Sequence, residues 1–422
     1  MTTGDSSDLS PDDAHILGLE SSAITGHTLK LMVFESGAPD FDLDELRADV
    51  AARLNTQPRA RQRVDTSGAG PRWVQADEFD IADHVRRYPD AGGDLLSAVD
   101  ALMAEHLDRS RPLWTFDLIG PVADGRQAIA ARIHHAMADG IAGVRFLEAV
   151  LFDPHPNPPP HTGEPGVRPI EKTGRLTEIR RLPGALHREL GHRGSSSPLD
   201  REITGSRELA FTVAPLSDLK EIGAALDDPA TVNDVLLAMI AGGLRSWLPK
   251  GAGRLRAQIP VSLHHRDEGS GDLGNRDSFL NVDLPLGEDD PMRRLAMIRA
   301  QTRVGKSSGD PQEMYDLFHA LGRLPRLGAA VQRLAGSARE FSLAISNVPG
   351  PTMTPVVQGR RVEHFFSSSE PAMHHALRIS AISCSGEMGI GLCTDPNALP
   401  GMAALAEAID AAFVELRQVA VM

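Results

Sequence analysis

The stretch that decides the fold runs from Gln127 to Val150 and reads QAIAARIHHAMADGIAGVRFLEAV. Its first part predicts a β-strand, in which successive side chains point to opposite faces of a sheet. Ile133 and His135 then share one face, and Arg132 and His134 share the other. The two adjacent histidines therefore point in opposite directions, so that one can face a cleft while its neighbour packs behind it.

A tight turn and a helix are expected directly after this strand. Asp139 and Gly140 end the turn. The apolar positions that follow have the spacing of a buried helical stripe: Ile141, Val144, Leu147 and Leu151. A strand, a tight turn and a helix in this order predict a side chain presented at the edge of a sheet.

Histidine at such a position suits acyl transfer. Its ordinary pKa of about 6.5 leaves the imidazole neutral near pH 7, so it can accept a proton and later return it. Transfer from a thioester needs both steps, because the acceptor must lose a proton and the leaving thiolate must gain one. The reaction also needs a site that is poor in water, since hydrolysis otherwise competes.

Adjacent histidines alone are weak evidence, because they occur at 134–135, 264–265 and 374–375. A single pair is more often structural than catalytic. What distinguishes the first pair is Asp139-Gly140 at a fixed distance, together with the predicted strand, turn and helix.

Other kinds of site fit the sequence poorly. Adjacent histidines on a strand cannot both reach one metal ion, and no His-Glu-x-x-His motif is present. The motifs of serine hydrolases (Gly-x-Ser-x-Gly) and of phosphate-binding loops (Gly-x-x-x-x-Gly-Lys-Ser/Thr) are also missing. We therefore expect no bound metal and no bound cofactor.

Composition limits the partners and the compartment. The net charge is −14 with no long basic block, which argues against nucleic-acid binding. Two cysteines in 422 residues are too few for a disulfide scaffold and favour a cytoplasmic location. The longest apolar run, Val235–Leu244, is too short to span a membrane and stops at Arg245. Peripheral contact with the inner face of a membrane or with a lipid droplet stays open.

The length predicts two domains, because single cores rarely grow beyond about 300 residues. Closely spaced prolines between Pro154 and Pro169 indicate an extended linker. We expect an N-terminal domain at 1–152, a crossover at 153–205 with a helical segment near 176–193, and a C-terminal domain at 206–422.

Both halves are predicted to mix strands and helices, which gives an α/β fold. Expected strands are 29–35, 116–119, 208–213 and 256–261, with a hairpin of 378–383 and 387–394 that turns at Ser385-Gly386. Expected helices are 44–54, 95–107, 217–225 and 233–248, the last with Asn233 as its N-cap.

The ordered motifs of the chain resemble a known family. His134-His135-x-x-x-Asp139-Gly140 fits the signature of the superfamily of chloramphenicol acetyltransferase, carnitine acyltransferases and condensation domains of peptide synthetases. Within it, the chain resembles the bacterial wax ester synthase/diacylglycerol acyltransferases. The further matching segments are Leu9–Ala14, Trp73-Val74, Phe79-Asp80, His84-Val85, Pro112-Leu113-Trp114, Asn233-Asp234-Val235, Gly274-Asn275-Arg276 and Ser346–Pro351.

This resemblance implies two chloramphenicol acetyltransferase-like domains, each a mixed sheet with flanking helices, and a tunnel between them. His135 would be the general base at the tunnel centre, beside His134, and Asp139 would either hold the loop through an arginine or polarise His135. Acyl-CoA would be the co-substrate, entering opposite an alcohol or amine acceptor. The remaining predicted substrate-binding residues are Gly140, Asn233, Asp234, Ser346, Asn347, His374 and His375.

Three functions follow as alternatives. The first is an acyl-CoA:alcohol acyltransferase that makes wax esters or triacylglycerol. The second is a tailoring acyltransferase of specialised metabolism, which would use a CoA or carrier-protein donor and a polar alcohol or an amine. This second reading rests on His374-His375 and Ser383-Cys384-Ser385-Gly386, where the family usually has other residues. The third is a catalytically silent binding or scaffold protein, against which the complete His135 and Asp139 signature argues.

Overall fold

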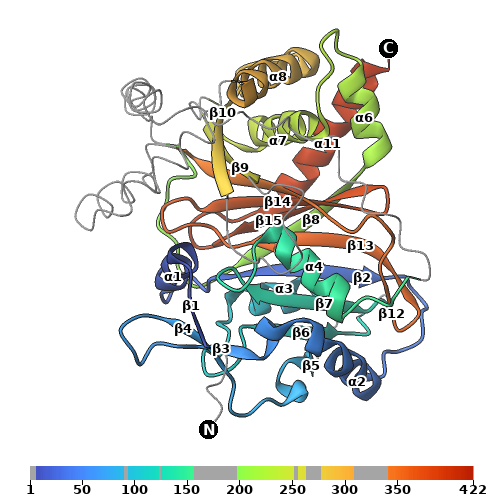
Figure 1. The fold of residues 1–422 in the computed structure, drawn as a ribbon. Helices are drawn as coiled ribbons and strands as arrows, with labels where there is room; N and C mark the ends of the chain where they lie inside the picture. The colour runs from blue at the N-terminus through green and yellow to red at the C-terminus, as the bar shows by residue number, and fades with distance from the viewer. Residues whose placement is uncertain are drawn as a thin grey trace.

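The computed structural model describes residues 6–89, 94–122, 125–155, 197–250, 255–262, 277–307 and 341–421. The predicted helix at 176–193, the histidines at 264–265 and the Gly274-Asn275-Arg276 motif lie outside these residues. The described chain forms two six-stranded sheets, one small sheet and flanking helices (Figure 1). The mixed α/β class is therefore confirmed.

The first large sheet has the order β12-β13-β2-β7-β6-β5. Its strands are β12 (Val356–Val357), β13 (Arg360–Ser369), β2 (His27–Phe34), β7 (Ala128–His134), β6 (Trp114–Ile119) and β5 (Val85–Arg87). Beside it lies the small sheet of β1 (Ser7–Asp8), β4 (Arg72–Gln75) and β3 (Gln62–Asp65). The helices of this N-terminal part of the chain are α1 (Pro11–Gly18), α2 (Leu43–Arg53), α3 (Leu95–Ala104) and α4 (Gly140–Val150). Short 3-10 turns lie at Leu54–Thr56, Pro58–Arg61 and Ile81–Asp83.

The second large sheet has the order β10-β9-β11-β14-β15-β8. Its strands are β10 (Asp277–Leu284), β9 (Leu255–Ser262), β11 (Leu343–Pro349), β14 (Leu377–Cys384), β15 (Glu387–Thr394) and β8 (Glu208–Pro215). Its helices, grouped at the upper side of Figure 1, are α6 (Leu216–Ala224), α7 (Val232–Trp247), α8 (Pro291–Ser307) and α11 (Met402–Ala420).

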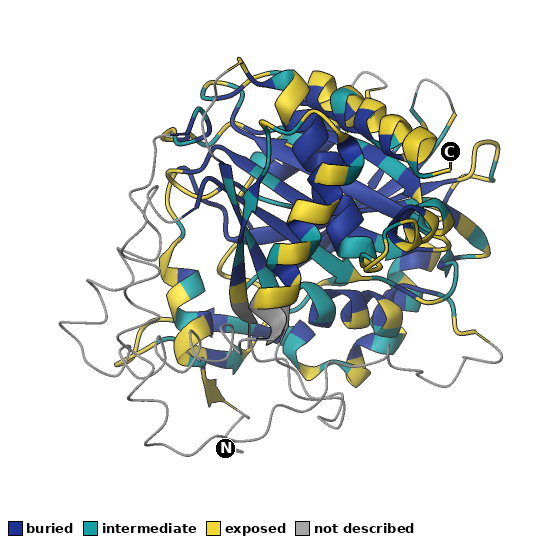
Figure 2. Ribbon diagram, turned by 90° about the horizontal axis from the view of Figure 1, so that it is seen from above, coloured by how far each residue is buried: buried dark blue, intermediate teal, exposed yellow. Residues whose placement is uncertain are grey.

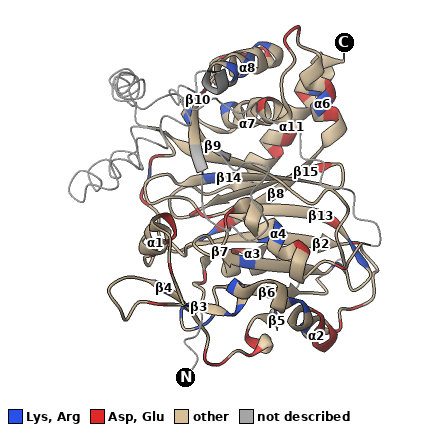
Figure 3. Cartoon of the chain, viewed as in Figure 1, with Lys and Arg blue, Asp and Glu red and all other residues tan. Residues whose placement is uncertain are grey.

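The two faces of the first sheet pack against different helices. Apolar side chains such as Met32 and Phe34 join α4 in one core, whereas Leu29 and Leu31 join α3 in another. Viewed from above, the strands of the two large sheets are mostly buried and the outer faces of the helices are exposed (Figure 2). Acidic and basic side chains are interspersed along the chain (Figure 3).

The expected elements are present, with small differences at their ends. The hairpin turns at Ser385 and Gly386, which have φ angles of 54° and 86°. Helix α3 stops at Ala104, before the predicted end at residue 107. The buried guanidinium of Arg132 explains this end, because it donates to the carbonyls of Leu102 and Glu105 at 3.0 and 3.1 Å.

The expected N-cap of α7 was wrong. The helix is capped by Thr231, whose hydroxyl accepts from the backbone N–H of Asp234 while the Asp234 carboxylate accepts from the N–H of Thr231. This reciprocal capping box satisfies two backbone donors, which a cap at Asn233 would not do.

The C-terminal span of 206–422 is not confined to one sheet. Strands β12 and β13 belong to this span of the chain but pair in the first sheet. There, β13 runs antiparallel to β2 with Ser367 opposite Lys30. A strand this far along the chain covers what would otherwise be an exposed edge of β2. Sequence order alone does not show which segment supplies that pairing.

The crossing of the two sheets depends on glycines in β15. A Cβ atom at Gly389 would lie 2.2 Å from the carbonyl oxygen of Phe365, and one at Gly391 would lie 2.3 Å from that of Ser367. Only glycine permits this approach of two backbones. Alternate glycines inside a predicted strand are the sequence signal for such a contact.

Candidate active site

His134, the last residue of β7, is held by both ring nitrogens. Its Nδ1 accepts from the N–H of Ala136 at 3.0 Å, so its proton lies on Nε2, which donates to Glu20 Oε1 at 2.7 Å. Burial acts to raise the pKa of Glu20, but the hydrogen bond from His134 and the charge of Arg109 lower it. His134 thus ties the turn to the segment after α1 and leaves no ring nitrogen for chemistry.

His135 follows directly and is only partly buried. Its backbone N–H donates to the carbonyl of Gly26 at 2.8 Å, which fixes the start of the turn. Burial and the positive charge of Arg378 lower the pKa of His135 to about 4, although Asp139 acts in the opposite direction. The imidazole is therefore neutral at physiological pH and can accept a proton.

Asp139 and Gly140 begin α4. Asp139 is its N-cap and accepts from the N–H of Ala142 at 2.8 Å. A Cβ atom at Gly140 would lie 2.8 Å from Cγ2 of Val348, which belongs to β11. These contacts fix the helix start and bring the first sheet's helix directly against a strand of the second.

Ser346 and Asn347 lie on the same strand as Val348. The Ser346 hydroxyl donates to Ser380 Oγ at 3.2 Å, and Asn347 is paired with Ala381 of the neighbouring β14. The predicted segment therefore lies where β11 approaches the histidine turn. Binding of substrate by these two side chains stays a prediction.

Lys30 was not among the predicted site residues. It is 1% exposed, and its Nζ donates to Ser367 Oγ on β13 at 2.7 Å. Burial lowers the pKa of Lys30 to about 8, with Asp139 acting in the opposite direction. A lone lysine within the apolar run of β2 is the signal that could have identified it.

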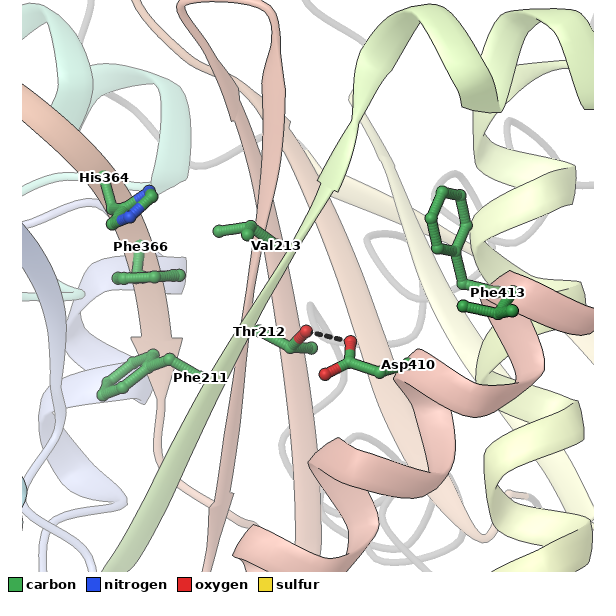
Figure 4. Close-up of a pocket in the computed structure, with 8 residues that line it drawn as sticks. Phe211, Thr212, Val213, His364, Phe366, Asp410 and Phe413 are labelled. Atoms are coloured by element: carbon green, nitrogen blue, oxygen red, sulfur yellow. Dashed lines mark hydrogen bonds between the residues drawn. The ribbon is translucent and has the colours of Figure 1, made fainter. Parts of the chain in front are cut away.

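An open hollow of about 460 Å³ lies elsewhere, between β8, β13 and α11 (Figure 4). Its lining includes Phe211, Phe366 and Phe413, and Thr212 donates to Asp410 at its floor. None of the predicted site residues lines it. It is therefore distinct from the histidine turn.

Comparisons with known proteins place these features in a family. A model of the wax ester synthase/diacylglycerol acyltransferase catalytic domain matches residues 9–189, and one of the WS/DGAT C-terminal domain matches 273–417. A diacylglycerol O-acyltransferase homologue of Mycobacterium tuberculosis is 32% identical over 79% of this chain and 75% of its own. The chain belongs to the wax ester synthase/diacylglycerol acyltransferase family.

Further similar proteins support this membership of the family. The O-acyltransferase WSD of Acinetobacter baylyi is 27% identical over 93% of both chains. The solved wax ester synthase/diacylglycerol acyltransferase of Marinobacter aquaeolei has a TM-score of 0.72 at 24% identity, covering 99% of this chain and 100% of its own. The starter condensation domain of rhizomide synthetase shares the fold, with a TM-score of 0.62 at 14% identity over 99% and 95% of the chains. The acyltransferase family and fold expected from the sequence are thus confirmed.

Two further family motifs lie in structural positions. Leu113 and Trp114 of the Pro-Leu-Trp motif are fully buried. Asp234 is also fully buried, and its Oδ1 accepts from the Thr302 hydroxyl of α8 at 2.7 Å. Asp234 therefore joins α7 to α8, and the adjacent Asn233 is half-buried at the start of α7.

His374 and His375 do not lie on a strand. They lie in a tight turn closed by the bridge between Ala372 and His375. His374 is exposed, whereas His375 is 2% exposed and its ring stacks on Phe341 with 4.1 Å between centroids. The two side chains face different ways because of the turn, and not because side chains alternate along a strand.

The described residues contain neither a metal-binding cluster nor a membrane-spanning helix. Within them, no group of three or more histidine, cysteine or acidic side chains is arranged to hold a metal ion. In the same part of the chain, no helix is both long and apolar enough to cross a membrane.

Proposed function

We propose that this enzyme transfers an acyl group from acyl-CoA to an acceptor hydroxyl, with His135 as the general base. The observation that carries the proposal is the contrast within one turn. Both ring nitrogens of His134 are engaged in holding the turn, whereas His135 is partly exposed and neutral. A neutral imidazole that is partly exposed can take a proton from an alcohol.

In the proposed reaction, His135 removes the proton of the acceptor hydroxyl as its oxygen attacks the thioester carbonyl. The tetrahedral intermediate then collapses, the carbon–sulfur bond breaks, and the protonated imidazole returns its proton to the CoA thiolate. The products are an ester and free CoA, and His135 is neutral again. Asp139 supports this cycle, because its negative charge favours the transient imidazolium.

The proposal includes no covalent acyl-enzyme. Burial raises the pKa of the Cys384 thiol to about 11 and that of Cys393 to about 12, so both are protonated near pH 7. A protonated thiol is a poor nucleophile. Intact mass measured after mixing with acyl-CoA alone should therefore show no adduct, and a stoichiometric acyl adduct would contradict direct transfer.

The preferred acceptors are a fatty alcohol or diacylglycerol, giving wax ester or triacylglycerol. The names of the mycobacterial diacylglycerol O-acyltransferase relative and of the Marinobacter wax ester synthase/diacylglycerol acyltransferase support these lipid substrates. A tailoring acyltransferase that uses a polar alcohol or an amine, with CoA or a carrier protein as donor, is the second candidate. The charges of Lys30, which is buried, and of Arg378, which is half-buried, both act on His135. They favour this second candidate, because such charges suit a more polar acceptor than a fatty alcohol. Peripheral binding to membranes or lipid droplets stays a prediction that cosedimentation would check.

The test is thiol release by the purified protein from acyl-CoA, with mass spectrometry of products from a panel of fatty alcohols, diacylglycerol, polar alcohols and amines. His374→Ala is the matched control for His135→Ala, because it removes an exposed histidine from the other described pair. Thiol release that depends on an acceptor and on His135 would support the proposal. Absence of release with every acceptor, or equal activity of the two variants, would overturn it.

A further inference from the structure

Two cations from different sheets act on the same imidazole. Lys30 lies on β2 of the first sheet and Arg378 on β14 of the second. Burial lowers the pKa of His135 most, the charges of Arg378 and Lys30 lower it further, and Asp139 is the carboxylate that opposes them. The charged groups with the largest effect on His135 are therefore two positive and one negative, which leaves an excess of positive charge at a buried site.

Lys30 carries the clearer part of this excess. An ammonium has three donors, and the bond that Lys30 makes goes to the neutral hydroxyl of Ser367. Among the described residues, no carboxylate lies within ion-pair distance of Lys30, and Asp139 acts on it only from further away. A cation that is 1% exposed and lacks a paired carboxylate is costly unless a ligand supplies the missing charge.

Burial weakens the base most, and the charges of Arg378 and Lys30 weaken it further. A pKa of about 4 for His135, against an ordinary value of about 6.5, means that its affinity for a proton is reduced more than a hundredfold. An anion bound beside Lys30 would cancel part of the positive field and return the imidazole toward its ordinary basicity. Binding of such a substrate would therefore activate the base that must deprotonate it.

We propose that Lys30, together with Arg378, forms a subsite for an anionic group, a carboxylate or a phosphate, that the acceptor carries close to its reacting hydroxyl. This inference rests on the proposed function of His135. The acceptor is the source of the anion because the acyl chain of the donor is apolar. The phosphates of CoA are also separated from the thioester by the long pantetheine arm, as they would be on a carrier protein.

The first experiment is equilibrium binding of acceptors without any acyl donor, so that no reaction takes place. The probes are β-hydroxydodecanoate against its methyl ester, for a carboxylate, and lysophosphatidate against monoacylglycerol, for a phosphate. In at least one pair we expect wild type to bind the charged member at least about tenfold more tightly, as charge-assisted hydrogen bonds do. The pair that shows the difference identifies the anion.

Three variants assign the preference to Lys30. Lys30→Met keeps the length of the side chain without its charge and should abolish the preference. Ser367→Ala removes the hydrogen-bond partner but keeps the ammonium, so the preference should remain. Lys220→Met, at an exposed position on α6, should bind like wild type. Equal binding of both members of each pair to wild type, or a preference that survives in Lys30→Met, would overturn the inference.

A second readout separates this role from a merely structural one. The His135 imidazole, followed by NMR in the wild-type chain, should show a higher pKa when the charged acceptor is bound and no change with its neutral partner. In Lys30→Met, the pKa of His135 should be higher than in wild type without any ligand. An unchanged pKa in both experiments would contradict the subsite. Because neither experiment requires turnover, failure here is distinguishable from failure of the acyl-transfer proposal.

Discussion

Two adjacent histidines lie at the end of β7 and the start of the turn that follows it, and two more lie in the turn before β14, but the two pairs have different surroundings. In the first, His134 is hydrogen-bonded through both nitrogens, and His135 lies partly exposed among charged groups. In the second, His374 is exposed and His375 is buried, and the ring nitrogens of His375 have no hydrogen-bond partner in the described chain. The first pair is the candidate active site because His134 anchors the turn while His135 is partly exposed.

The largest expected effect is that of His135→Ala. Loss of a positioned proton acceptor should lower kcat/KM by at least about two orders of magnitude. Steady-state thiol release measures this, and the far-ultraviolet circular dichroism should match wild type. If instead His134→Ala were the more damaging change, the assignment of the two roles would have to be exchanged.

The pH profile gives the next effect. Since the pKa of His135 is lowered to about 4, the neutral base persists well below the ordinary range of histidine. We expect the acid limb of kcat/KM to fall near pH 4, and activity at pH 5.5 to be close to that at pH 7 once stability is controlled. An acid limb centred near about 6.5 would show that the site does not lower this pKa.

His134→Ala should mainly reduce stability. The change removes one buried and one partly buried hydrogen bond and leaves Glu20 without its imidazole donor, a loss of about 1–3 kcal/mol. Thermal and denaturant unfolding measure this, and the fall in kcat should be smaller than that of His135→Ala. Unchanged stability with a full loss of activity would contradict an anchoring role.

The smallest effects are expected in the second pair. His374→Gly removes an exposed side chain and should change neither stability nor the ratio of fatty-alcohol to polar-acceptor products. His375→Gly removes the ring stacked on Phe341 and should lower the melting temperature without changing that ratio. An altered product ratio in either variant would place this turn at the acceptor site.

Most single elements could be predicted from local pattern. Alternation in β7 assigned the faces of Arg132 and His134 correctly, because one face of that strand packs on α3 and the other on α4. Caps were harder, since Thr231 and Asn233 are both plausible and only the reciprocal bonds with Asp234 distinguish them. The turn at 372–375 could not be predicted, because a short apolar and histidine-rich segment is compatible with either a turn or a strand.

By itself, the sequence determined the family, the mixed α/β class and the candidate base, because the motif and the periodicity around 127–150 are local properties. Tertiary structure alone decided that β13 completes the first sheet, that Gly140 meets Val348, and that burial together with the charges of Arg378 and Lys30 lowers the pKa of His135. Each of these depends on contacts between residues far apart in the chain. Strand pairing and burial create them, and burial in turn sets the charge balance at the site, which no local pattern records.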